Sequence, residues 1–125
     1  MQQFLRFSTD NLPERDRVAI WSEVFGRYII ATKLEAVAGI PFSQNATLRS
    51  LPGLSLASMS CSGFRGSRIG DMLADGNDNL NIIINIAGTG EYRQLGREAV
   101  VSSHEAVLLS STEDVYAFFR APYDP

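Results

Sequence analysis

The sequence predicts a mainly β domain, an antiparallel jelly-roll sandwich or barrel with one α-helix near its N-terminus. Two observations lead to this fold class. From residue 46 onward, apolar and polar residues alternate in short segments separated by glycine, proline and aspartate, which is typical of half-buried strands joined by turns. No helical pattern lies between those segments, so the crossover connections of a parallel sheet have no room.

The helix is expected over about residues 12–28. Asn11, followed three residues later by Glu14, has the form of an N-terminal capping box. Glu23 and Arg27 stand four residues apart and can pair on the exposed side. The expected buried side is an apolar stripe with spacings of three and four, made of Val18, Trp21, Val24, Phe25 and Tyr28.

The barrel is expected over about residues 46–119. Turns are predicted at Pro52-Gly53 and at Gly96, and Gly88-Thr89-Gly90 is expected to close a hairpin. Residues 80–87 form the clearest strand, because three consecutive isoleucines stand between turn residues. The predicted strands are 46–51, 54–61, 64–69, 80–87, 91–95, 98–101, 106–109 and 115–119.

Composition and charge restrict the class of protein. The 125 residues suffice for one domain with a single core, and no apolar run reaches the roughly 20 residues of a membrane span. The net charge of −3, without a basic run, argues against this segment holding nucleic acid by itself. The single cysteine, Cys61, and the start Met1-Gln2-Gln3-Phe4, which is not a secretory signal, agree with a cytoplasmic protein.

Catalytic and metal sites are not expected. His104 is the single histidine, whereas a jelly-roll metal site needs about two or three imidazoles and a carboxylate. Ser103 and Ser110 lie near this histidine in the sequence, but no nucleophile-elbow pattern surrounds them. Cys61, at the end of an apolar strand, is typical of a small buried side chain. We therefore expect a non-enzymatic protein without a metal or cofactor.

Candidate ligand-binding residues come from the faces of the strands. Asn81 and Asn85 share one face of strand 80–87 and would suit a pocket wall inside a barrel. Tyr92 and Tyr116 lie on later strands, and Arg49 could meet a carboxylate ligand. For each of these residues, a solvated surface position is the alternative.

Five segments occur in the order found in a known family. They are an opening from Phe7 to Arg17 that leads to Trp21 and Val24-Phe25-Gly26, the turn and strand 51–57, the pair 80–88 and 94–100, and the strand 106–111. Together they run over nearly the whole chain. They resemble the N-terminal ligand-binding domain of AraC/XylS-type transcription regulators.

The resemblance implies a cupin-like β-barrel over residues 1–125 that senses a small-molecule effector or mediates association, with a homodimer as one form. Effector binding would shift the parent protein between DNA-binding states. The family binds DNA through a C-terminal pair of helix-turn-helix units, which this sequence lacks, so we expect one domain of a longer protein. A second departure is Ser103-His104-Glu105, where the family usually has a Pro-Gly-Asp turn.

Two other classes of protein stay open. A small cupin enzyme, such as an isomerase or dioxygenase, would need a bound metal, and the histidine count weighs against it. A stand-alone β-barrel interaction module would have a filled interior and would bind no small molecule.

Overall fold

The computed structural model describes residues 3–122, and the chain ends at residues 1–2 and 123–125 lie outside the described part. Within that part, the chain forms the α-helix α1 (Glu14–Tyr28), the 3-10 helix η1 (Gly70–Asp75) and ten strands. Within residues 3–122, neither helix combines the length and the hydropathy that a membrane span requires. The strands are β1 (Gln3–Ser8), β2 (Lys33–Ala36), β3 (Gln44–Leu51), β4 (Leu54–Cys61), β5 (Phe64–Arg68), β6 (Leu80–Asn85), β7 (Thr89–Gln94), β8 (Arg97–Val101), β9 (Glu105–Ser110) and β10 (Val115–Arg120).

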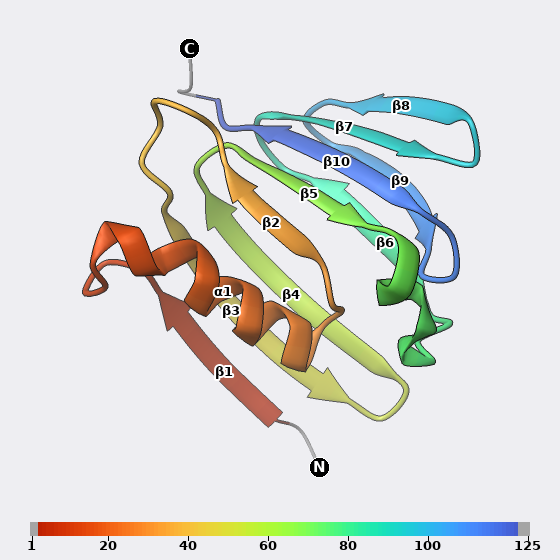
Figure 1. Cartoon of the computed structure of the whole chain (residues 1–125), viewed down its shortest axis with the longest axis horizontal. Coiled ribbons are helices and arrows are strands. Elements are labelled where there is room, and N and C mark those ends of the chain that lie inside the picture. Colours follow the sequence, from red (N-terminus) through yellow and green to blue (C-terminus); the bar gives the residue numbers. More distant parts are fainter. Residues whose placement is uncertain (1–2, 123–125) are drawn as a thin grey trace.

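The strands form two layers (Figure 1). The front layer is a five-stranded sheet in the order β2-β5-β10-β7-β8, and the rear layer contains the sheets β1-β3-β4 and β6-β9. Every described strand pair is antiparallel, so the predicted antiparallel barrel-like fold with one α-helix is confirmed. β1 and β2 precede residue 46, so the strands begin earlier than the expected range of 46–119.

α1 packs against β2 and β3 and closes one side of the space between the layers (Figure 1). Trp21 is 3% exposed and is buried in one core cluster with Phe42, Ala46 and Leu48. Most of the predicted stripe packs against this cluster, whereas Tyr28 at the helix end is 40% exposed. The predicted pair of Glu23 and Arg27 also forms, with an N–O distance of 3.0 Å.

The predicted capping box does not form. α1 begins at Glu14, its N-cap residue is Pro13, and no side chain caps its first turn. The Leu12 N–H donates to the carbonyl of Thr9 at 3.0 Å, so Asn11 lies inside a turn that precedes the helix. The predicted start at residue 12 was early for the same reason.

Two predicted turns join neighbouring strands. Pro52-Gly53 connects β3 to β4, and Gly53 has a φ of 73°, which suits the position after proline in a tight turn. Leu95-Gly96 connects β7 to β8, and both residues have positive φ, as in the two-residue hairpin turns that match strand twist.

The predicted hairpin at Gly88-Thr89-Gly90 is wrong. β6 pairs with β9, whereas β7 pairs with β8 and β10, so the chain crosses here from the rear layer to the front layer. Gly88 has a φ of 83°, and a Cβ at this position would lie 2.5 Å from the carbonyl oxygen of Arg120. The glycine permits a close approach to the end of β10, next to the point where Thr89 of β7 is aligned with Arg120.

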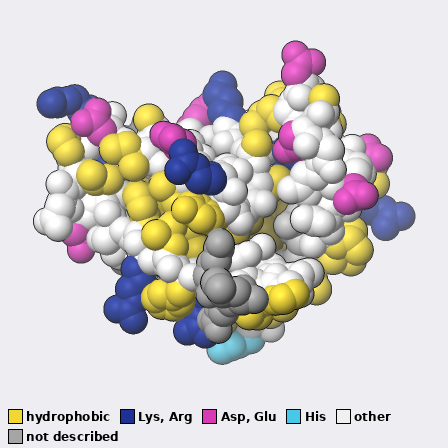
Figure 2. Space-filling view, turned by 90° about the horizontal axis from the view of Figure 1, so that it is seen from below, with side chains coloured by type: hydrophobic (Ala, Val, Ile, Leu, Met, Phe, Trp, Pro, Cys, Tyr) yellow, Lys and Arg dark blue, Asp and Glu magenta, His cyan; other side chains and the backbone are white. Residues whose placement is uncertain are grey.

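A second core lies between the β6-β9 sheet and the front layer, with Tyr92, Val101 and Leu109 as its buried residues. The opposite side of β6-β9 is apolar and exposed. Seen from below, hydrophobic side chains gather in patches, with charged side chains beside and around them (Figure 2). We use the name β6–β9 apolar face for five exposed side chains, Leu80, Ile82, Ile84, Ile86 and Leu108.

Candidate functional site

The two predicted amides lie on the inner side of β6 and are engaged with the protein itself. The Asn81 Nδ2 group donates to the Ser111 hydroxyl at 2.8 Å. Asn85 is 8% exposed, and its Nδ2 group donates to the carbonyls of Gly88 at 2.8 Å and Val101 at 3.3 Å. These hydrogen bonds hold loops and strands together.

Tyr92 also points into the space between the layers. It is 9% exposed and is buried against Val101 and Leu109. Burial raises the pKa of its hydroxyl above the ordinary value of 10.0, and the nearby Cys61 thiol raises the pKa further. A Cβ at Gly90 would lie 2.7 Å from the Tyr92 ring, so glycine lets this ring lie against its own strand.

The other two predicted residues lie on outer surfaces. Tyr116 is 48% exposed on the front layer, where it stands opposite Arg93. Arg49 is exposed on the rear layer, and its guanidinium carbon lies 5.2 Å from the centre of the Phe4 ring. The structure therefore does not bring the five predicted residues together in one site.

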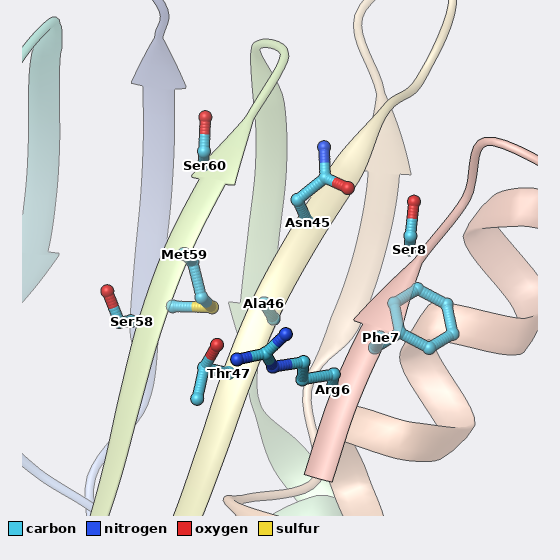
Figure 3. Close-up of a pocket in the computed structure, with 9 residues that line it drawn as sticks. All are labelled: Arg6, Phe7, Ser8, Asn45, Ala46, Thr47, Ser58, Met59 and Ser60. Atoms are coloured by element: carbon cyan, nitrogen blue, oxygen red, sulfur yellow. The ribbon is translucent and has the colours of Figure 1, made fainter.

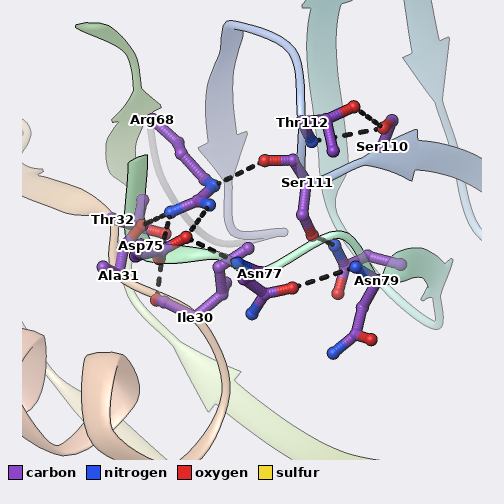
Figure 4. Close-up of polar contacts among 11 residues, drawn as sticks. Ile30, Ala31, Thr32, Arg68, Asp75, Asn77, Asn79, Ser110, Ser111 and Thr112 are labelled. Carbon is purple, nitrogen blue, oxygen red and sulfur yellow. Dashed lines mark hydrogen bonds and ion pairs between the residues drawn. The ribbon is translucent and has the colours of Figure 1, made fainter. Parts of the chain in front are cut away.

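Arg68 occupies a buried polar site that the sequence did not indicate (Figure 4). Its side chain is 1% exposed and donates two hydrogen bonds, at 2.8 and 2.9 Å, to the Asp75 carboxylate. It also donates to the carbonyls of Ala31 and Ser111, each at 3.1 Å. Arg68 thus joins β5 to η1, to the segment before β2 and to the turn between β9 and β10, which is a structural role.

The carboxyl group of Asp75 reflects this pairing. Its pKa is lowered from 3.8 to about 2, first by the hydrogen bond from Arg68 and next by the hydrogen bond from the Asn77 N–H. Asn77 in turn accepts a hydrogen bond from the Asn79 N–H at 3.0 Å, which extends the network along the loop before β6 (Figure 4). Because these charges satisfy one another, the network offers little to a ligand.

The outer side of the β1-β3-β4 sheet carries a different polar arrangement (Figure 3). Antiparallel register aligns its outward side chains across the three strands, and the Arg6 side chain extends across β3 toward Thr47. An open hollow of about 470 Å³ lies over part of this surface. The rows, which we call the outer polar face, are Phe4-Arg49-Leu56, Arg6-Thr47-Ser58 and Ser8-Asn45-Ser60.

Most polar side chains of this face are free for a ligand, whereas the Ser8 hydroxyl accepts a hydrogen bond from the Asp10 N–H at 3.2 Å. Among the described residues, no hydrogen bond engages the side chains of Arg6, Asn45, Thr47, Ser58 or Ser60. Hydroxyl and amide groups can both donate and accept hydrogen bonds, whereas guanidinium groups only donate. The outer polar face is therefore the candidate functional site.

Residues 3–122 contain no group of three His, Cys, Asp or Glu side chains that could hold a metal ion. His104 lies in the turn between β8 and β9, where its N–H donates to the Asn85 carbonyl at 2.7 Å. Its φ of 69° is a left-handed conformation that glycine adopts more readily. The turn thus forms although histidine occupies the position where AraC/XylS-type domains, which the sequence resembles, usually have glycine.

Sequence reasoning indicated Arg49 but missed the remaining residues of the outer polar face. Alternation identified the strands that contain residues 46–51 and 54–61, but it did not give their pairing with β1, which sets the rows. One usable signal was present. The segments that form β1 and β3 each contain one arginine, and neither they nor the β4 segment contain an acidic residue.

Comparison with known proteins supports the fold. No family model and no curated protein matches the chain. Among solved structures, the fold matches part of a transcription regulator with a TM-score of 0.81 over 95% of this chain. That structure is the AraC-like transcriptional activator CuxR, which shares 14% identity with the chain and is matched over 44% of its own length. The predicted resemblance to an AraC-type domain is confirmed at the level of fold.

Proposed function

We propose that the chain is the effector-sensing regulatory domain of an AraC-like transcription regulator. The observation that carries this proposal is the fold shared with CuxR over 95% of the chain. In the proposal, the domain binds a small-molecule effector in the cytoplasm, performs no catalysis, and leaves DNA binding to another segment of the parent protein. The net charge of −3 supports that division, because DNA binding draws much of its affinity from lysine and arginine.

The effector would act by differential binding. A ligand that binds one state of the domain more tightly shifts the parent protein toward that state. We assign Arg49 to effector binding, because it is exposed on the outer polar face. We assign Asn81, Asn85 and Tyr92 to the support of the interior, because they are packed or hydrogen-bonded there. Tyr116 stands apart on the other layer.

The source gene beyond codon 125 tests the regulator assignment. We expect the same reading frame to encode a pair of helix-turn-helix units, whose recognition helices enter successive major grooves. A reading frame without any DNA-binding segment would contradict the assignment.

A thermal-shift screen tests the sensing role separately. A compound that binds only the folded domain raises its melting temperature. We expect at least one compound in a set of small acids, sugars and aromatics to do so. If none does, the domain is better described as an interaction module.

The β6–β9 apolar face favours an interaction function in addition. Its five apolar side chains are 59–69% exposed, and contiguous apolar patches of this kind mark interaction surfaces. Because its five defining side chains are all apolar, the face can pack on its own copy around a two-fold axis. We propose that two copies of the chain associate through it.

Light scattering on the purified chain tests this association. We expect a dimer for the unchanged protein and a monomer for Ile82→Glu, because a carboxylate would be buried without a partner. Val100→Glu is the matched control, since Val100 is 63% exposed on the front layer. A monomeric unchanged protein, or a dimer that Ile82→Glu leaves intact, would contradict the proposed interface.

A further inference from the structure

The β1-β3-β4 sheet differs in charge from the rest of the chain. The whole sequence has 14 acidic and 11 basic residues. The three strands of this sheet have two arginines, Arg6 and Arg49, and no aspartate or glutamate. This rear-layer sheet is therefore a positive surface on a protein whose net charge is negative.

The two arginines, which we call the rear arginine pair, converge on one aromatic ring. The guanidinium carbons of Arg6 and Arg49 lie 5.5 and 5.2 Å from the centre of the Phe4 ring. No ion pair within the described part of the chain includes either arginine. Both charges therefore lie beside the same ring, and no ion pair with an acid neutralises them.

We propose that the outer polar face binds an anionic carbohydrate, such as a uronic acid or a sugar phosphate. Guanidinium groups bind carboxylates and phosphates through paired, charge-assisted hydrogen bonds. The Thr47, Ser58 and Ser60 hydroxyls beside them suit the hydroxyl groups of a sugar. Phe4, which is 48% exposed, offers an apolar surface for the C–H side of a sugar ring.

The size of the face agrees with a ligand of this class. The open hollow of about 470 Å³ includes Arg6, Asn45, Thr47, Ser58 and Ser60 in its lining. Phe4 and Arg49 line a second hollow, of about 260 Å³. Small-molecule sites typically measure roughly 300–1,000 Å³. A nucleic acid fits less well, because two arginines without further basic residues neutralise few phosphates. The inference rests on the proposed function only where it treats the bound carbohydrate as the effector.

Titration calorimetry with simple probes tests the proposal. The probes are sodium glucuronate and glucose 6-phosphate, with glucose as the uncharged control. We expect at least one anionic probe to bind tenfold or more tightly than glucose. Binding of only one of them would identify the carboxylate or the phosphate as the recognised group. The absence of binding by both anions, or tighter binding of a single-stranded oligonucleotide, would overturn the proposal.

Paired variants locate the site. The double variant Arg6→Ala, Arg49→Ala should weaken binding of the anionic probe tenfold or more, because charge-assisted hydrogen bonds are lost. The matched control is Arg65→Ala, Arg120→Ala, which removes a similar pair of arginines around Phe118 on the front layer. Both double variants should keep the melting temperature of the unchanged protein within a few degrees. Equal weakening by the two would contradict the assignment of the site.

The outcomes separate this inference from the proposed function. Anion binding at the outer polar face, in a gene that encodes no DNA-binding segment, would leave the site standing and refute the regulator assignment. A gene that encodes helix-turn-helix units, with no anion binding at this face, would refute the site alone.

Discussion

The rear arginine pair has a counterpart on the front layer. There, Arg65 and Arg120 both lie near the Phe118 ring, with guanidinium carbons 4.9 and 5.8 Å from the ring centre. The surroundings of the two arrangements differ. On the front layer, Glu91 stands opposite Phe118 and Glu35 stands opposite Arg65, whereas β1, β3 and β4 contain no acid.

The difference in neighbouring acids shows that the number of arginines alone does not identify a binding surface. On the front layer, acidic neighbours balance the positive charge, and Arg93 is paired with Glu98 at 2.8 Å. On the rear layer, the positive charge has no counterpart within its sheet. We therefore expect the buried arginine of the front layer to contribute to the stability of the fold. The exposed arginines of the rear layer are expected to contribute to ligand binding.

The largest effect is expected for Arg68, the buried arginine of the front layer. Arg68→Ala should lower the free energy of unfolding by about 3 kcal/mol, because it leaves an acid and two carbonyls without their donor. Arg49→Ala should change it by less than about 0.5 kcal/mol, as is usual for an exposed position. Urea denaturation measures both. Similar losses of unfolding free energy in the two variants would contradict the distinction between the stabilising buried arginine of the front layer and the exposed binding arginines of the rear layer.

An acidic residue placed on the outer polar face should neutralise its positive charge, as acidic neighbours do on the front layer. Thr47→Glu puts a carboxylate in the row of Arg6, so binding of the anionic carbohydrate should weaken about tenfold or more through repulsion and competition. Ser67→Glu, on the outer side of the front layer, is the control. Calorimetric titration of both variants checks the prediction, and undiminished binding by Thr47→Glu would refute the electrostatic argument.

A smaller effect is expected from the titration of Asp75. Its pKa is about 2 in the folded chain against an ordinary 3.8, so its carboxylate stabilises the fold above pH 3.8. That contribution is lost as the pH falls through about 2, where the folded carboxylate takes up a proton. Denaturation of the unchanged protein and of Asp75→Asn over this range should show the steeper pH dependence in the unchanged protein. If the free energy of unfolding depended on pH equally in both proteins, the charge of the Asp75 carboxylate would contribute nothing to stability through its pairing with Arg68.

The smallest effect is expected for the exposed pair of Arg93 and Glu98, whose side chains are 64% and 67% exposed. Solvent screens such pairs, so Arg93→Ala should cost less than about 0.5 kcal/mol in unfolding free energy. Addition of salt should diminish even this difference. A loss as large as that of Arg68→Ala would show that exposed front-layer arginines also hold the layer together.

The parts of the fold that depend on local chemistry could be predicted from the sequence. Pro52-Gly53 and Gly96 indicated turns, because proline fixes φ and glycine accepts positive φ. Gly88 was predicted to lie in another hairpin turn. In the structure, its backbone lies close to the carbonyl of Arg120, which is 32 positions away in the sequence, and no local sequence pattern indicates such a contact. The predicted capping box was wrong for a different reason: Asn11 lies inside the turn that the hydrogen bond from the Leu12 N–H to the Thr9 carbonyl closes, so it does not cap the helix.

The candidate site could be predicted only in part, because it is built by pairing between strands. Arg49 was identified from its place in an alternating strand. Arg6 and Ser58 join it only through the registers of β1 with β3 and of β3 with β4. The burial of Arg68 was equally hidden, since arginine is usually exposed and its partners come from separate segments.

Amide chemical-shift mapping of the ¹⁵N-labelled chain, during a titration with whichever of glucuronate and glucose 6-phosphate binds more tightly, locates the anion site without any substitution. We expect shift changes concentrated in residues 4–8, 45–49 and 56–60 of the rear layer, with residues 115–120 of the front layer unchanged. Changes confined to the front layer or to the β6-β9 sheet, or no change at saturating concentrations of either anionic probe, would contradict anion binding at the outer polar face.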